Sequence, residues 1–470
     1  MSNNRYKKLA INSAIFAIAN FGSSVLRFII VPFYTYYLTT EEYGTVDIIS
    51  TTVNLLLPVF VLSIQDAVLR YSLKKEIDNS TVLMNSYFVL IISSFVFSIS
   101  YFISRILSID IRLWGYFYAL LLVQALFGVL QNYTRGIGKS IGFAFAGLVN
   151  TIVLLGANII LLAGLKMGIK GYLMALLLSY IIPSILLLYI NRQTYIFSFS
   201  YVKISLLKKM LRYSLPLIPT AMMWWIMNAS DRYVITWFLG VSATGIYAVS
   251  HKIPSVMHMI YTIFQQAWQV SAIEESEAKD RTLFYGKIYK VFCDGLIIAA
   301  ACIVLLIRPI ISLAVENSYV TAWKYAPFLV ISSVFSSLAG FLGINYIVAE
   351  QTIGAFTTAA VTACINLVVN LALTPFIGMY GTAIGTLIGY FMLWLIRSID
   401  TQKYIKYDQN YKIIFIQAGL LFAESIVLLR EIPYSKTIAL LLALVIILTG
   451  WNTVLEIAKK IVSIIRNKTK

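Results

Sequence analysis

The sequence is poor in charged residues, and most of those it has are basic. Only 12% of its 470 residues are Asp, Glu, Lys or Arg, and 37 Lys and Arg stand against 20 Asp and Glu. It has two His and three Cys, each Cys lies in an apolar run, and no CxxC spacing occurs. These shortages argue against a disulfide framework and a metal site. No carboxylate pair, Ser/His/Asp set or nucleotide-binding loop stands in a recognisable context. We therefore predict that the protein is not an enzyme and uses no cofactor.

Apolar residues are abundant instead. They make up 60% of the chain, and the mean hydropathy is +0.83. Runs of 18 or more apolar residues recur along the whole length, which predicts a multi-pass protein of the lipid bilayer. The first run is too long for a cleavable signal peptide and lacks a small-residue cleavage site, so we expect it to stay as a span.

We predict fourteen membrane spans. Even parity puts both termini on one side, and most Lys and Arg lie in the termini and the even-numbered loops, so that side should be cytoplasmic. The same placement argues against nucleic acid as the partner of the basic charge. The strongest basic loops are predicted at Arg192 to Arg212 and Arg397 to Lys412. The spans start near Leu9, Val46, Leu83, Leu113, Ile141, Gly171, Leu211, Thr244, Tyr289, Ala322, Ala355, Gly381, Ile413 and Lys436.

An internal repeat organises these spans. The stretch from Tyr6 to Gly44 matches the one from Leu207 to Gly245 without a gap, and the stretch from Ile141 matches the one from Ile353, with Asn158 on Asn370. Six spans lie in each copy, so the copies should have one orientation and be related by an axis along the membrane normal. Spans thirteen and fourteen have no partner.

The predicted fold is therefore an all-α polytopic membrane protein with two six-helix lobes as parallel repeats and two extra C-terminal helices. The expected divisions are residues 1–205, 206–400 and 401–470. Gly-x-x-Gly pairs at Gly168/Gly171 and Gly378/Gly381 should form tight outer turns, because glycine permits the backbone such turns need.

Three cations are predicted inside spans: Arg27, Arg232 and Lys252. Arg27 lies eleven residues from the outer end of its span, about 16 Å at the helical rise. A charge at mid-membrane costs roughly 2.5–3.5 kcal/mol on insertion scales, so it usually faces a cavity or a partner. Snorkelling toward the headgroups is the alternative for each residue alone. A shared, water-filled cationic lumen explains all three and would favour an anion.

Acidic residues also fall in the spans. Asp66 and Arg70 are four apart and can pair on one helix face. Asp231 adjoins Arg232, and because adjacent helical residues point in different directions we expect them to need different partners. Asp294 lies near the cytoplasmic end of span nine, and Glu424 lies inside span thirteen. A proton or cation relay is the functional reading for Asp66, Asp231 or Asp294, and a structural ion pair is the alternative for Asp66 with Arg70.

His251 and His258 are the only histidines. Pro254 lies between them and is expected to kink their helix. No third ligand accompanies them, so no metal site is predicted. His251, next to Lys252, is a candidate to line the lumen or titrate there.

Several of these residues carry a family resemblance. The runs that carry it are Asp231-Arg232-Tyr233-Val234-Ile235, Phe238-Leu239-Gly240, Gly245-Ile246-Tyr247, Glu42-Tyr43-Gly44, Asp66 to Tyr71 and Phe264 to Trp268. They resemble the Wzx-type polysaccharide flippases of the multidrug/oligosaccharidyl-lipid/polysaccharide exporter superfamily, over nearly the whole chain.

The resemblance implies a two-lobe transporter of the bacterial cytoplasmic membrane that alternates between inward-open and outward-open forms. The implied cargo is undecaprenyl-pyrophosphate-linked oligosaccharide, such as an O-antigen repeat unit, and a polysaccharide polymerase and a chain-length regulator are implied partners. Arg27 and Lys252 occupy places similar to basic lumen residues of the related lipid II flippases. Arg232, His251 and Arg70 join them as candidate substrate-binding residues. In those relatives the last two spans form a groove for the lipid tail. The coupling ion, proton or sodium, stays open.

Three rival functions differ from this one in cargo or in chemistry. A multidrug exporter of the same fold would move organic cations, which a cationic lumen disfavours. A membrane polysaccharide polymerase or ligase should have large outer loops, whereas the loops predicted here are short. A lipid II flippase would differ only in cargo.

Overall fold

The computed structural model describes residues 30–74, 76–106, 113–194, 196–274, 280–349 and 351–451. The chain divides into two compact units, Met1–Trp225 and Ile226–Lys470, with the division inside one long helix. Every regular element in the described ranges is a helix, so the predicted all-α class is confirmed.

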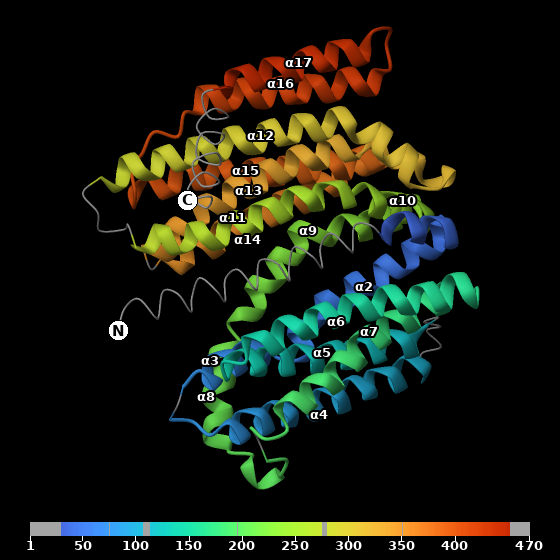
Figure 1. Ribbon diagram of the computed structural model, residues 1–470, viewed down its shortest axis with the longest axis vertical. Coiled ribbons are helices and arrows are strands. Elements are labelled where there is room, and N and C mark those ends of the chain that lie inside the picture. Colours follow the sequence, from blue (N-terminus) through green and yellow to red (C-terminus); the bar gives the residue numbers. More distant parts are fainter. Residues whose placement is uncertain are drawn as a thin grey trace, which may run out of the picture. The chain divides into compact units, whose positions relative to one another are not determined.

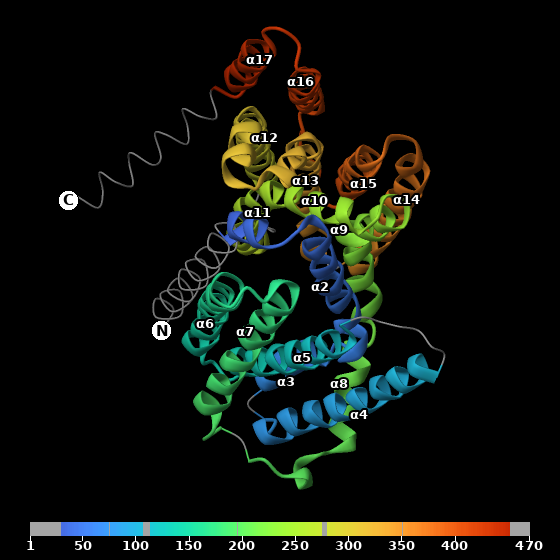
Figure 2. The same ribbon diagram turned by 90° about the vertical axis from the view of Figure 1, so that its right-hand side faces the viewer.

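The first unit is a bundle of helices. Within it, α6 packs along α7, and α7 packs along α5 (Figure 2). Its helices are α2 (Thr40–Phe60), α3 (Ile64–Ser72), α4 (Asn79–Ile106), α5 (Trp114–Gly136), α6 (Ser140–Asn158), η1 (Ile159–Gly164), α7 (Gly168–Asn191), η2 (Phe199–Tyr201), α8 (Ile204–Ser214) and the start of α9 (Leu217–Leu239).

The second unit has the same kind of packing and ends in an added hairpin. Helix α14 packs along α15, α15 packs along α13, and the hairpin of α16 and α17 lies on α12 (Figure 1). Its helices after α9 are α10 (Val241–Ser250), α11 (Lys252–Glu274), α12 (Arg281–Ala314), η3 (Asn317–Lys324), α13 (Ala326–Val348), α14 (Thr352–Ile377), α15 (Met379–Asp400), η4 (Thr401–Lys403), α16 (Tyr411–Arg430) and α17 (Ser435–Thr449).

Ten helices in the described part are long and apolar enough to cross a membrane: α2, α4, α5, α6 with η1, α7 and α12 to α16. The predicted count of fourteen spans stays a prediction. Of the other four predicted spans, the first lies mostly outside the described residues. Helices α9 and α11 carry several polar residues, which lowers their hydropathy, and α17 is 15 residues long.

The turn that ends the first copy of the repeat starts α2. Thr39 caps this helix: its hydroxyl accepts from the backbone N–H of Glu42, and the Glu42 carboxylate accepts from the backbone N–H of Thr39. Both N–H groups would otherwise lack a partner at the helix start.

The two halves of the repeat make the same turn. Gly168 at the start of α7 and Gly378 before α15 both have positive φ, 54° and 61°. Three residues further on, a Cβ on Gly171 would lie 3.1 Å from the carbonyl oxygen of Leu161. A Cβ on Gly381 would lie 2.6 Å from the backbone carbon of Leu373, which is the residue that matches Leu161 in the repeat. The predicted tight turns are present, and glycine is needed in each because the preceding helix passes so close.

Polar side chains and glycines also join α14 to α15. A Cβ on Gly389 would lie 2.8 Å from the Cβ of Asn366, whose amide donates to the carbonyl of Gly385 at 3.3 Å. Asn370 donates to Asn366 Oδ1 at 3.3 Å. Small residues let two membrane helices approach until such amides can bond across them.

Arg397 corrects the predicted loop from Arg397 to Lys412. It lies in the last turn of α15 and is 3% exposed. Its guanidinium donates to the carbonyl oxygens of Ala339 and Ala355 at 3.0 and 3.2 Å and to the hydroxyl of Thr358 at 3.1 Å. These acceptors on α13 and α14 replace water around the charge, so this arginine joins three helices instead of lying in a loop.

Candidate functional site

Asp231, Arg232 and His251 form a compact charged cluster in the second unit. Asp231 on α9 is 3% exposed. Its Oδ1 accepts from Nη1 of Arg232 at 2.8 Å, and its Oδ2 lies 3.0 Å from Nε2 of His251. Arg232 Nη1 also donates to the carbonyl oxygen of Asn228 at 2.9 Å. One buried carboxylate thus holds a guanidinium and an imidazole at the same time.

This arrangement corrects the expectation that Asp231 and Arg232 need different partners. The long Arg232 side chain folds back along α9, and its backbone N–H also donates to Asp231 Oδ1 at 2.9 Å. Adjacent helical residues do point apart at Cβ, but a guanidinium on three methylenes can reach around that angle. The cluster therefore combines an adjacent pair with a third group from another helix.

His251 is placed by a break between two helices. Helix α10 ends at Ser250 and α11 begins at Lys252, so His251 sits at the junction, with its ring against Tyr247 at a centroid distance of 4.9 Å. Pro254 lies in the first turn of α11, where its missing N–H leaves no hydrogen bond unmade. The expected effect of Pro254 is present as this break, which falls three residues before it, because a proline ring clashes with the carbonyl group four residues earlier, here that of Ser250.

A polar pocket of about 200 Å³ adjoins the cluster. Both histidines line it, and the hydroxyl of Tyr390 donates to Oδ1 of Asn228 at its wall at 2.6 Å. The lining residues are Met227, Asn228, His251, Pro254, Ser255, His258, Leu329, Ser332, Ser333, Ser336, Thr386 and Tyr390. Hydroxyls, an amide and imidazoles at this density can hydrogen-bond a polar ligand in several directions. None of the lining residues is a carboxylate, lysine or arginine.

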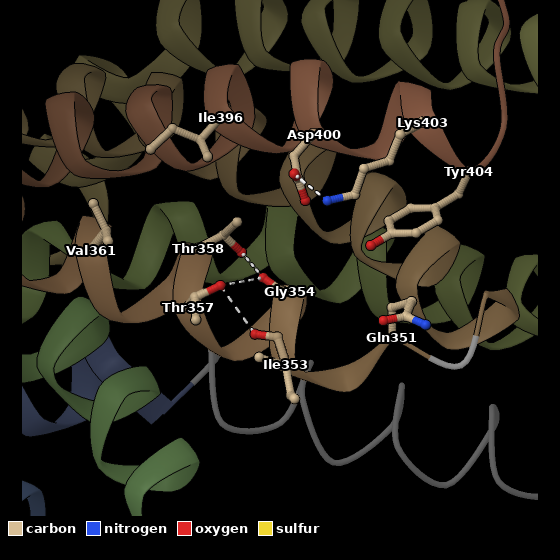
Figure 3. Close-up of a pocket in the computed structure, with 10 residues that line it drawn as sticks. All are labelled: Gln351, Ile353, Gly354, Thr357, Thr358, Val361, Ile396, Asp400, Lys403 and Tyr404. Carbon is tan, nitrogen blue, oxygen red and sulfur yellow. Dashed lines mark hydrogen bonds and ion pairs between the residues drawn. The ribbon is translucent and has the colours of Figure 1, made fainter.

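A second pocket of about 520 Å³ lies where α14 begins and α15 runs into η4 (Figure 3). Lys403 donates to Asp400 Oδ1 at 2.8 Å, and the hydroxyl of Tyr346 donates to Asp400 Oδ2 at 2.6 Å. The hydroxyls of Thr357 and Thr358 bond back to carbonyls of their own helix, as those of Ser255, Ser332 and Ser333 do in the first pocket. The charged groups here are already paired with each other, which makes this pocket a weaker candidate for the cargo.

The other predicted site residues lie elsewhere. Lys252 is the half-buried first residue of α11. Asp294 on α12 is buried and accepts from Nε2 of Gln417 at 3.1 Å. In the first unit, Asp66 and Arg70 are exposed on α3 and form no ion pair with each other. The Arg70 guanidinium instead stacks on the ring of Tyr213 at 4.3 Å. Arg27 lies outside the described residues.

Sequence reasoning missed the wall of the pocket. Its main contributors are the serines of α13 and the Asn228–Tyr390 bond between α9 and α15. The doublets Ser332-Ser333 and Ser336-Ser337 stand four residues apart in an apolar helix, which puts their hydroxyls on one face. The sequence shows that spacing. It does not show that Asn228 bonds to Tyr390, which lies 162 residues further along the chain.

The fold defines a multi-pass helical membrane protein, and its second unit holds a pocket lined mainly by polar residues. The family model "Polysaccharide biosynthesis protein" matches residues 9–270, more than half of the chain. The protein belongs to this polysaccharide biosynthesis family, as the sequence resemblance predicted. A comparison with curated proteins found no match.

Solved structures share the fold at low identity. The lipid II flippase MurJ in an inward closed conformation is 14% identical, with a TM-score of 0.67, over 94% of this chain and 100% of that one. An inward-facing multidrug resistance MATE transporter is 13% identical, with a TM-score of 0.65, over 83% and 98%. A MOP superfamily transporter from Pyrococcus furiosus is 14% identical, with a TM-score of 0.57, over 83% and 94%. The MurJ/MATE-like fold is thus confirmed.

Proposed function

We propose that the protein is a flippase for undecaprenyl-pyrophosphate-linked oligosaccharide repeat units of an O-antigen or similar surface polysaccharide. It moves them from the inner to the outer leaflet of the bacterial cytoplasmic membrane by alternating access. The observation that carries this proposal is the match to the polysaccharide biosynthesis family over residues 9–270. The shared fold with MurJ over 94% of the chain supports it.

The pyrophosphate is held by basic residues. Arg27, Arg232 and Lys252 supply positive charge, with His251 and Arg70 as further candidates. Arginine binds phosphate oxygens through paired donors. Asp231 keeps Arg232 compensated while no cargo is bound, and an arriving pyrophosphate competes with Asp231 for the same guanidinium. His251 then stays in contact with Asp231 and continues to compensate the charge of its carboxylate.

The repeat offers a reason to group Arg27 with this site. The ungapped match that puts Tyr6 on Leu207 puts Arg27 on Asn228 (27 + 201 = 228). Asn228 lines the polar pocket and accepts from Tyr390. The first copy thus carries a cation where the second carries a pocket amide. The pocket's hydroxyl groups suit the sugar part of the cargo, since sugars both donate and accept hydrogen bonds.

The remaining parts of the proposal follow from the same reading. Residues 1–205 and 206–400 act as the two lobes, residues 401–470 add a helix pair, and both termini are cytoplasmic. Asp66, Asp231 or Asp294 serves an ion-coupling role with protons or sodium. The bilayer, a polysaccharide polymerase and a chain-length regulator are the expected partners.

A multidrug exporter is the second candidate, because MATE transporters share the fold with a TM-score of 0.65. A polysaccharide polymerase or ligase is the third candidate. None of the three similar structures described for this chain is of such an enzyme. The placement of cationic residues in the predicted spans favours an anionic cargo over the organic cations of the second candidate.

Deleting the gene tests all three readings. We expect surface polymer to be lost and completed lipid-linked repeat units to accumulate on the cytoplasmic leaflet. Normal polymer with raised sensitivity to cationic drugs would support the exporter instead. Unpolymerised repeat units on the outer leaflet would indicate the enzyme. Returning the gene with Arg27, Arg232 or Lys252 changed singly to Ala then tests the residues, and full function in all three would contradict the cationic site.

A further inference from the structure

The interface between α12 and α16, which we call the seam, runs in constant register. Gln417 Nε2 donates to Asp294 Oδ1 at 3.1 Å. About four helical turns further along, Nη1 of Arg308 on α12 lies 3.5 Å from Oε1 of Glu431, the residue that directly follows α16. Both contacts join residues 123 positions apart (417 − 294 and 431 − 308). Midway between them, the same register places Glu424 opposite Ala301.

Glu424 is fully buried at this point of the seam. It is 0% exposed, and neither carboxyl oxygen has a hydrogen-bond partner among the residues that the structure describes. Ala301, also 0% exposed, offers only a methyl group. The two polar contacts of the seam are each seven residues away, about 10 Å at the helical rise.

The helices packed against α16 bring no charge to the level of Glu424. These helices are α12, α13 and α17, and α15 also contacts α16 through the rings of Phe391 and Trp394 on Phe415. The charged groups of α15, Arg397 and Asp400, lie near the end where α16 begins, because the hydroxyl of Tyr411 donates to the carbonyl oxygen of Ser398. The tyrosines of α15 are Tyr380 and Tyr390. On the seam face of α12 the nearest charged groups are Asp294 and Arg308, each engaged with its own partner on α16. Among the other titratable groups, Lys436 lies in the first turn of α17 and Tyr346 lies near the C-terminal end of α13. Helix α12 also carries Cys293 and Cys302. Its remaining titratable residues all precede Asp294, and they are Arg281, Tyr285, Lys287, Tyr289 and Lys290.

An ionised carboxylate in this position would lack every form of compensation. A buried charge without a partner is so costly that the group neutralises instead. Ionisable groups kept inside membrane helices despite that cost usually serve transport of ions or protons. The described contacts give Glu424 no structural bond that would explain its presence, whereas Asp294 and Glu431 on either side each have one.

We propose that Glu424 is a proton-binding site: it carries a proton in this conformation and releases it when the seam opens during the transport cycle. With no exposure to solvent, the proton cannot exchange while α16 stays packed on α12. The hairpin of α16 and α17 thereby becomes the part of the chain that senses the proton. This site is additional to the acids already considered, and its occupancy does not depend on which cargo the protein carries.

Infrared spectroscopy of the purified full chain tests proton occupancy. At neutral pH we expect a carbonyl stretch of a protonated carboxylic acid that disappears in Glu424→Gln. Asp294→Asn is the matched control, because it removes the neighbouring acid of the same seam and should leave that band. A band that persists in Glu424→Gln, or its absence from the unaltered protein, would overturn the proposal.

Complementation tests proton release. Gln mimics the protonated carboxyl but cannot ionise, so Glu424→Gln should reach the membrane at the normal level and fail to restore surface polymer. Full restoration would overturn release at this residue. If deleting the gene itself leaves the polymer unchanged, the proposed cargo is wrong, and the infrared result still decides whether Glu424 holds a proton.

Discussion

Two buried carboxyl groups of the second unit, Asp231 and Glu424, have opposite surroundings. Asp231 is bound on one oxygen by Arg232 and faces His251 with the other. Glu424 has no partner on either oxygen within the described residues, and the register of α12 and α16 puts it level with Ala301. Both are nearly or fully shielded from solvent, at 3% and 0% exposure.

The difference shows what a buried acid needs in order to keep its charge. The guanidinium and the imidazole compensate Asp231, so its charge can persist. Glu424 has no such compensation, and a neutral carboxyl avoids the cost of a buried charge. In our proposals, the first acid organises the site for the anionic cargo and the second binds a proton.

Replacing Asp231 should have the largest effect. Asp231→Ala removes the carboxylate that compensates the Arg232 charge, and breaking a buried ion pair in this way typically costs about 3–5 kcal/mol. We expect a strongly lowered melting temperature of the purified protein and loss of transport. Changing Arg232 to Met in the same chain should recover part of the stability, since the stranded charge is then gone. An unchanged melting temperature in Asp231→Ala would show that the cluster is not a stabilising pair.

Replacing Glu424 by an apolar residue should act in the opposite direction. A buried polar group without a hydrogen bond costs about 1–3 kcal/mol, so Glu424→Met should raise the free energy of unfolding by a similar amount. Thermal unfolding in detergent measures this. We expect the stabilised variant to be inactive in transport. Destabilisation would mean that the carboxyl has a structural partner and that the contrast with Asp231 fails.

Replacing His251 should have a smaller effect. A Gln side chain can keep a hydrogen bond to Asp231 Oδ2 but loses the ring contact with Tyr247, so His251→Gln should lower the free energy of unfolding by about 1 kcal/mol. His251→Leu, which removes the bond as well, is the comparison variant and should cost more. Equal melting temperatures for the two variants would show that the His251–Asp231 contact contributes nothing.

Replacing Arg308 should have the smallest effect. Arg308 and Glu431 are 47% and 45% exposed, and exposed ion pairs contribute about 0–1 kcal/mol. Arg308→Ala should therefore leave the melting temperature almost unchanged. A large loss would indicate that the outer end of the seam is held closed by this pair, and that opening near Glu424 requires breaking it.

Much of the architecture could be predicted because it depends on local pattern and on the repeat. The matched turns at Gly168 and Gly378 follow from glycine spacing, and the all-helical class follows from the apolar runs. Asp231, Arg232 and His251 were singled out because charge is rare inside spans. Their mutual contacts could not be predicted, since these depend on how α9 packs against the junction of α10 and α11.

The lack of a hydrogen-bond partner at Glu424 could not be predicted from the sequence for a related reason. The residue is visible as an acid inside an apolar run, but its environment depends on the register between two helices 123 residues apart. A shift of one turn would give it a partner or expose it. Arg397 shows the reverse case, because it reads as the start of a basic loop and is instead enclosed by carbonyl groups of α13 and α14.

Reconstituted transport tests the central claim most directly. The purified protein would be placed in vesicles that carry a polyprenyl-pyrophosphate-linked oligosaccharide in both leaflets, and an impermeant glycosidase would be added outside. We predict that the enzyme then digests the whole lipid-linked pool, whereas vesicles with Asp231→Ala or without protein keep the inner-leaflet share. Protection of that share in vesicles containing the unaltered protein, under a proton gradient of either direction, would contradict the account.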